Sequence, residues 1–209
     1  MIPGTSPVWS TLVLLTSLTL PSISSQADSA LPAFGRDTVL VYKSSLENDV
    51  LVVRIAEFVP DRLIEWEDAT TQGTVLMPAK AVADARAFVS WQLFQAGMDT
   101  RGNNATTLWL SRRIFRELRD KQKAKLMIES LPTGVRVIGR DQMAIEVNRS
   151  SRNLPVVKTM DERGAERWFL DAEDNPLLVN FVSRTYEQKL TSITTDRPNT
   201  LRWIKKKLE

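Results

Sequence analysis

The stretch RWFLDAEDNPLLVNF, residues Arg167–Phe181, sets a short acidic segment between two runs of large apolar residues. Trp168 and Leu170 alternate along the first run, which places both on one face of a strand. Pro176 fixes the backbone φ angle ahead of the second run, as proline does in turns that join strands. We therefore predict a hairpin in which the segment DAEDNP joins two buried strands.

An alternative interpretation of this segment is a catalytic group of carboxylates, formed by Asp171, Glu173 and Asp174. Acid–base catalysis by two carboxylates needs environments that separate their pKa values, and glycoside hydrolysis needs a pair about 5–9.5 Å apart. Neighbouring acids at the tip of a turn share one wet environment, and Asp174 or Asn175 can instead hydrogen-bond its own backbone. The sequence therefore favours the hairpin, with a carboxylate-dependent hydrolase acting on envelope glycans as the alternative function.

On both sides of this hairpin, short runs rich in β-branched and aromatic residues recur between turn residues, which is typical of an antiparallel sheet. No internal repeat or linker divides the chain. We predict one mainly β (α+β) domain over residues 28–196, an antiparallel curved sheet or half-barrel. The expected strands are 38–45, 50–59, 62–70, 74–77, 86–94, 106–110, 124–129, 134–139, 143–147, 154–159, 166–170, 177–184 and 189–194.

One amphipathic helix is expected to pack against this sheet. Ile114, Phe115 and Leu118 fall on one helical face, with arginines around them. Ser111 is suited to cap the first turn of this helix. A second, shorter helical segment is expected to begin at Pro78.

The N-terminus has a pattern typical of a signal peptide over residues 1–27. Residues 8–20 are apolar but too few to cross a bilayer comfortably, which takes about 20 residues. Small residues follow and end in Ser25-Gln26-Ala27, which suits a signal peptidase. We predict an exported protein, periplasmic or extracellular, that is soluble after cleavage near Ala27. Residues 1–8 carry no Lys or Arg, so an uncleaved membrane anchor is the alternative.

The composition excludes several kinds of chemistry, because the 209-residue chain has neither histidine nor cysteine. The Ser-His-Asp triad, the Cys-His pair, His-ligated zinc or haem and disulfides are therefore all ruled out. Ser111 with a nearby lysine as base would need no histidine, but a lysine at an exposed helix end stays protonated. We expect a non-enzymatic protein with no catalytic residue, no metal site and no cofactor.

Two basic segments stand out, since the whole chain has a formal net charge of only +3. Residues 112–125 contain seven Lys or Arg and two acids, and residues 197–209 form a basic C-terminal tail. The sequence favours a solvated helix face and tail over contact with an anionic membrane surface. No nucleic-acid partner is expected, because stacking aromatics do not interleave the basic residues. The candidates for membrane contact are Arg112, Arg113, Arg116, Arg119 and the tail.

Arg112 and Arg113 oppose the helix dipole, which favours negative charge at a helix N-terminus. In one explanation they bind an anion together with Ser111 and the free backbone N–H groups. In the other they pair with acidic groups elsewhere in the domain. The sequence leaves both explanations open.

Two motifs carry a resemblance to known proteins. WLSRRIFREL from Trp109 has the pattern W-[VL]-S-R-x-x-[FY]-x-E-L, and the stretch from Trp168 has the pattern W-x-L-D-x-x-[DE]-N-P-L. Residues 77–194 resemble a group of uncharacterised exported bacterial proteins with both motifs. More loosely, the region is similar to DUF3108 and LolA/LolB half-barrels, sheets wrapped around a helix that shield apolar cargo. The resemblance implies a fold and a compartment, and little chemistry.

Large apolar side chains on the expected strands and helix are candidates for a ligand cavity between sheet and helix. If the sheet curls around the helix without filling the space, they line that cavity; otherwise they form a solid core. The expected role is thus to bind or carry an apolar or amphiphilic ligand, such as a lipid, at the cell envelope, or to act as an envelope interaction module. The cavity candidates are Trp66, Trp91, Trp109, Phe115, Leu118 and Trp168.

Overall fold

The computed structural model of the chain describes Met1 and residues 31–46, 49–90, 94 and 96–195. The expected cleavage site, the basic tail over 197–209 and Trp91 lie outside the described residues. Within the described ranges, no helix has both the length and the apolar character to cross a membrane.

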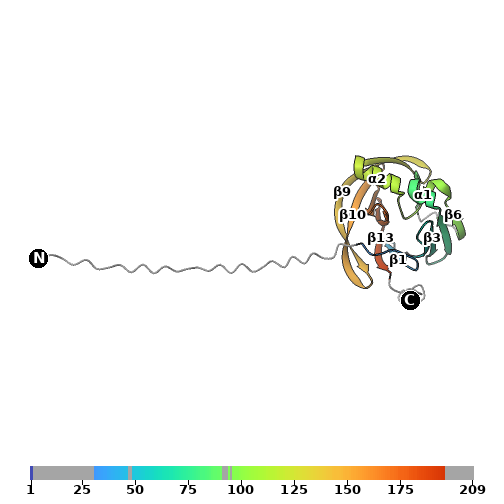
Figure 1. Cartoon of the computed structure of the whole chain (residues 1–209), viewed down its shortest axis with the longest axis horizontal. Coiled ribbons are helices and arrows are strands. Elements are labelled where there is room, and N and C mark those ends of the chain that lie inside the picture. Colours follow the sequence, from blue (N-terminus) through green and yellow to red (C-terminus); the bar gives the residue numbers. More distant parts are fainter. Residues whose placement is uncertain (2–30, 47–48, 91–93, 95, 196–209) are drawn as a thin grey trace.

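The strands of the described region form one large curved sheet (Figure 1), which confirms the predicted mainly β fold. The first half of the chain contributes an antiparallel meander of four strands, with a fifth strand added in parallel at its edge. In the order of the sheet from this edge, they are β6 (Gly97–Thr100), β4 (Gln72–Met77), β3 (Arg62–Glu67), β2 (Val50–Glu57) and β1 (Val39–Ser44).

The second half of the chain continues the same sheet from β1. The strands follow in the order β13 (Glu187–Thr194), β12 (Leu178–Val182), β11 (Glu166–Leu170), β10 (Ser150–Asp161), β9 (Leu131–Val147), β8 (Lys123–Ile128), β5 (Ala87–Phe88) and β7 (Ala105–Thr106). β13 also meets β9 in parallel at Ser192 and Ile193. This contact closes β9 to β13 into a ring of five strands.

The longest strand differs from the prediction. The sequence predicts separate strands over 134–139 and 143–147, whereas β9 runs unbroken through both ranges. β9 continues through Gly139 because a bulge forms there: the register of β9 and β10 shifts beside the pair Gly139 and Lys158.

Two other expected strands are reduced to two residues each within the described region. The strand expected over 106–110 stops at Thr106, because the left-handed backbone of Leu108 (φ 56°) turns the chain. Trp109 then forms an isolated antiparallel bridge with Leu177. The strand expected over 86–94 is reduced to the two residues of β5 within the described region.

Two α-helices of the described region, α1 (Ala79–Asp84) and α2 (Arg112–Lys121), lie side by side at the top of Figure 1. A short 3-10 helix, η2 (Gly102–Asn104), lies against α1. α2 begins as predicted, because the Ser111 hydroxyl accepts the N–H of Ile114 at 3.3 Å. Its apolar face, with Phe115 and Leu118, packs toward the sheet and is buried.

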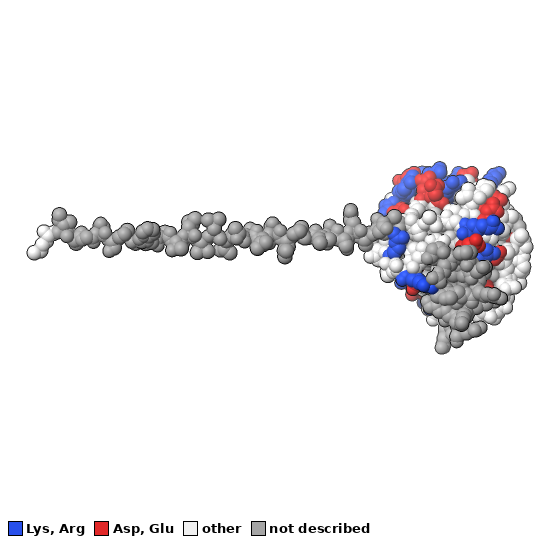
Figure 2. All heavy atoms as spheres, turned by 60° about the horizontal axis from the view of Figure 1, so that its bottom comes forward, with Lys and Arg blue, Asp and Glu red and all other residues white. Residues whose placement is uncertain are grey.

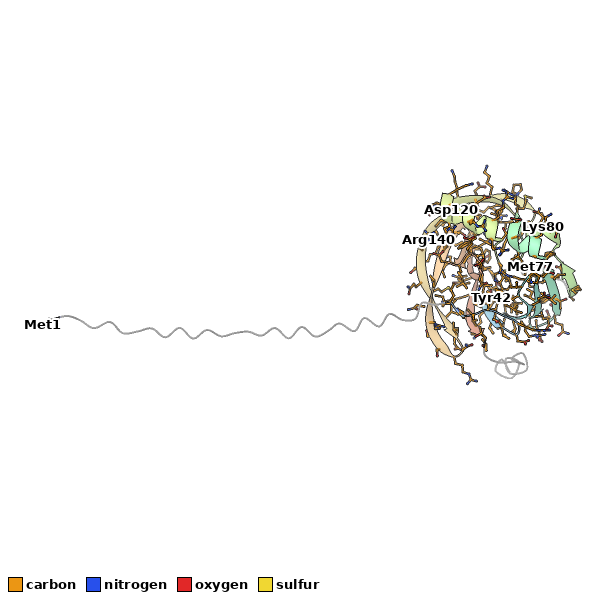
Figure 3. All side chains as sticks on the ribbon, in the orientation of Figure 1. Met1, Tyr42, Met77, Lys80, Asp120 and Arg140 are labelled. Carbon is orange, nitrogen blue, oxygen red and sulfur yellow. The ribbon has the colours of Figure 1, made fainter. Side chains whose placement is uncertain are left out.

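The sheet carries a separate hydrophobic cluster beneath α2 and a larger one in the body of the domain. The cluster beneath α2 includes Phe88, Phe115, Leu118, Leu126 and Phe169. Tyr42 belongs to the larger cluster and lies well inside the ribbon, whereas Lys80 and Asp120 lie at the periphery (Figure 3). The Tyr42 hydroxyl donates to the carbonyl oxygen of Leu178 at 2.8 Å, and burial raises the pKa of this phenol.

Candidate functional site

The segment DAEDNP joins β11 to β12 as a hairpin, as the sequence predicts. Leu170 is fully buried, and Trp168 packs against the same hydrophobic cluster, as expected for a shared strand face. The turn itself is closed by the backbone N–H of Asn175, which donates to the carbonyl oxygen of Ala172 at 3.1 Å. We call residues 171–175 the acidic turn.

Each carboxylate of the acidic turn has an arginine partner. Glu173 accepts hydrogen bonds from Arg116 at 2.5 Å and from Arg119 at 2.6 Å. These bonds hold the pKa of Glu173 below its usual range. The other two pairs join Asp171 to Arg140 at 3.1 Å and Asp174 to Arg112 at 3.7 Å.

The acidic turn therefore attaches the β11–β12 hairpin to α2 and β9. A general acid needs a carboxyl group that stays protonated near neutral pH, and the arginines favour the opposite state for Glu173. Asn175 also differs from the prediction, because its side-chain oxygen accepts the indole N–H of Trp109 at 2.7 Å rather than a bond from its own backbone.

Each of the three anion-binding candidates at the start of α2 makes a hydrogen bond or an ion pair within the protein. Ser111 caps the helix and also donates its hydroxyl to the carbonyl oxygen of Ala85 at 2.7 Å. Arg112 approaches Asp174, and Arg113 approaches Glu117 at 3.5 Å within the same helix. These contacts match the second explanation, in which the arginines pair with acidic groups.

The structure does not gather the described cavity candidates around one space. Trp66 and Trp109 are buried in the larger cluster, and Trp168 borders it. Phe115 and Leu118 lie in the cluster beneath α2, with 2% and 1% of their surface exposed. Trp91 lies outside the described residues.

Arg62 is a buried cation that the sequence analysis did not single out. Only 2% of its surface is exposed, and its guanidinium group stacks between the rings of Phe58 and Trp109, at 4.7 and 4.9 Å from their centroids. One nitrogen donates to the backbone oxygen of Asp174 at 2.8 Å, while Nε and Nη1 have no hydrogen-bond partner in the described structure. Burial, together with the charge of Arg112, lowers the pKa of Arg62 to about 9. Arg62 thus supports the acidic turn from the interior.

A surface groove runs across β8, β9 and β10 beside the C-terminal end of α2, with a volume of about 480 Å³. Strand register explains its shape: Lys123 and Met160 flank Arg136 on the neighbouring strands, and Lys125 faces Gly134. Because Gly134 has no side chain, it opens a hollow in the second row. We call this the basic groove; it is lined by Glu117, Lys121, Lys123, Ala124, Lys125, Gly134, Val135, Arg136, Met160, Asp161 and Glu162.

A smaller groove of about 330 Å³ adjoins the basic groove. The two share Lys125, Gly134 and Glu162. Met127 and Pro132, which are cross-strand partners, extend the lining of this adjoining groove with apolar surface. Taken together, the two grooves give the β8–β9 surface a strip of apolar and methylene groups with a charged rim.

The charges at the basic groove are unbalanced. Two of its three acids are already engaged: Glu117 lies within 3.4 Å of Arg86, and Asp161 accepts a hydrogen bond from Arg167 at 2.8 Å. Within the described part of the chain, none of the groove's four cations has a carboxylate partner. These cations are Lys121, Lys123, Lys125 and Arg136.

The basic segment over 112–125 therefore divides into two parts. Its four arginines, all on α2, pair with acidic side chains. Its three lysines lie along the basic groove without such partners in the described region. The sequence shows the excess of positive charge in this segment. The fold shows that its lysines are the part left without carboxylate partners in the described region.

On the face shown in Figure 2, Lys and Arg side chains lie beside Asp and Glu side chains along the upper edge of the domain and in smaller groups at its sides, with uncharged surface between them. Within the described ranges, no group of three or more Asp or Glu side chains is arranged to hold a metal ion.

Comparisons with protein families, with curated proteins and with solved structures find no match to this chain.

Proposed function

We propose that the protein binds an anionic amphiphile, an alkyl chain with a carboxylate or phosphate head group, and that the basic groove is its site. The observation that supports this proposal is the set of four cations that line a partly apolar groove without carboxylate partners in the described structure. Such cations attract an anionic group, and the apolar surface between them favours a hydrocarbon chain.

The size of the basic groove suits a ligand of this kind. Small-molecule sites span about 300–1,000 Å³ and combine apolar lining with a few polar groups, and this groove has about 480 Å³. Lys123 and Arg136 are direct neighbours across β8 and β9, so one head group can contact both. Met160 beside Arg136 adds a flexible apolar side chain to the lining of the groove.

The function is binding or carrying, without conversion of the ligand. On the predicted export of the chain, we assign this role to the cell envelope, where the ligand would be a lipid or a product of lipid breakdown. The carboxylate-dependent hydrolase gains no support from the acidic turn, because Asp171, Glu173 and Asp174 each have an arginine partner.

Calorimetric titration with dodecanoate, decanoate and dodecyltrimethylammonium, each below its micellar concentration, tests this proposal. A buried methylene contributes about 0.8 kcal/mol, so dodecanoate should bind up to about 15-fold more tightly than decanoate. The cation should bind at least tenfold more weakly than dodecanoate, and the affinity for dodecanoate should fall as salt screens the lysines. Equal binding of the anionic and cationic amphiphiles, or no binding of either, would contradict the proposal.

A further inference from the structure

The two grooves meet at shared residues, one of which carries an acidic side chain. Glu162, Gly134 and Lys125 line both of them. A Cβ atom added at Gly134 would lie 2.9 Å from the carboxyl carbon of Glu162, so this carboxyl group rests over the bare backbone of Gly134. The hollow that Gly134 opens is thus already occupied by a carboxylate of the protein.

The backbone of Glu162 is held in place, whereas its carboxylate is not. Its N–H donates to the carbonyl oxygen of Gly134 at 3.2 Å. The turn that follows is fixed by Asp161, whose side chain accepts the N–H groups of Arg163 and Ala165 at 2.9 and 3.0 Å. The exposed carboxylate itself has no hydrogen bond or ion pair in the described structure. Rotation of this side chain would break no contact of that kind.

The surroundings of the hollow favour an anion. Lys125 stands opposite Gly134 on β8, and the pair Lys123 and Arg136 forms the next row of the same two strands. A ligand head group placed over Gly134 would lie among these cations. Its alkyl chain would have apolar surface available in the adjoining groove at Met127 and Pro132.

We propose that the position over Gly134 is the head-group subsite of the basic groove, and that Glu162 is a built-in competitor which an anionic head group displaces. This inference deepens the proposed function and rests on it. When Glu162 rotates away, the two grooves join into one trough. Glu162 thereby selects against weakly charged or neutral amphiphiles, which gain less from the cations around the hollow.

Titration of dodecanoate and of neutral dodecanol into wild type, Glu162→Gln and Glu146→Gln tests this inference. Glu146 is an exposed acid on β9, so its replacement changes the net charge equally without touching the subsite. Glu162→Gln should bind dodecanoate about five- to tenfold more tightly than wild type. Glu146→Gln should stay within about twofold, and the affinity for dodecanol should rise less than that for dodecanoate in Glu162→Gln.

A second variant, Gly134→Ala, fills the subsite with a methyl group and should weaken dodecanoate binding at least fivefold, with the fold checked by circular dichroism. If all proteins bind dodecanoate and Glu162→Gln matches Glu146→Gln, the competitor role is wrong while the proposed function stands. If Gly134→Ala binds as tightly as wild type, the subsite is misplaced. If no protein binds dodecanoate, both the proposed function and this inference fail.

Discussion

The indole N–H of Trp109 donates a 2.7 Å hydrogen bond to the side-chain oxygen of Asn175, and both residues are buried. The two residues are 66 positions apart in the chain. Their bond joins the segment that leads into α2 to the acidic turn that docks on α2. Arg62 reaches the same place, because it stacks on Trp109 and donates to the backbone of Asp174.

Replacement of Asn175 by Ala should therefore destabilise the domain. It leaves the Trp109 indole N–H buried without a partner, which costs about 1–3 kcal/mol. Urea unfolding monitored by far-UV circular dichroism measures this loss. Asn153→Ala, at an exposed position of β10, is the matched control and should change the free energy of unfolding by less than about 0.5 kcal/mol. Equal effects of the two changes would contradict the role assigned to the Trp109–Asn175 bond.

The ion pairs of Glu173 predict a dependence of stability on pH. Hydrogen bonds from Arg116 and Arg119 lower the pKa of Glu173 in the folded state. A lowered pKa gives stabilisation that is present above the unfolded-state pKa, about 4.3, and is lost as pH falls through the folded value. Wild type should thus be more stable than Glu173→Gln at pH 7, and the two should converge at low pH. A difference that persists unchanged at pH 2 would rule out this explanation.

The buried ion pair of Asp161 and Arg167 should contribute more to the stability of the fold than the ion pairs of Glu173. Their side chains are 1% and 9% exposed, and the carboxylate also holds the turn that carries Glu162. Asp161→Asn removes the charge and leaves Arg167 buried without a counter-ion, which costs about 3–5 kcal/mol. The midpoint of thermal unfolding measures this loss. Asp141→Asn, which breaks an exposed pair with Lys158, serves as the control and should lower the midpoint much less. Similar midpoints for the two variants would argue against a stabilising role of the buried pair.

Export is predicted from the N-terminal sequence alone. The apolar run over 8–20 followed by Ser25-Gln26-Ala27 predicts cleavage that leaves Asp28 as the first residue. N-terminal sequencing of the protein recovered from cell fractions checks this prediction. The mature protein should start within a few residues of Asp28, and a full-length product held in the membrane fraction would favour the uncleaved anchor.

Much of the fold could be predicted because its causes are local. The cap at Ser111 and the apolar face with Phe115 and Leu118 define α2, and proline with acidic residues marks the β11–β12 turn. The unbroken course of β9 could not be predicted in the same way. It depends on a bulge in its pairing with β10, which is a property of two strands rather than of one sequence.

The candidate site depends even more on contacts between distant segments. The basic segment over 112–125 is visible in the sequence, but the partners of its arginines come from other elements as well as from α2 itself. The hollow at Gly134 appears only when β8 and β9 pair in register and place Lys125 opposite it. Arg62 occupies an inward position at the start of β3, where a charged residue would be expected to face solvent.

Titration of dodecanoate into two double variants tests most directly whether the lysines of the basic groove bind an anionic amphiphile. One variant carries Lys123→Ser and Lys125→Ser; the other carries Lys43→Ser and Lys189→Ser, at exposed cross-strand partners on β1 and β13. Both lose the same charge. We predict that the groove variant binds dodecanoate at least tenfold more weakly than wild type, while the control variant stays within about twofold. Equal affinities of the two variants for dodecanoate would show that the lysines of the basic groove do not bind it.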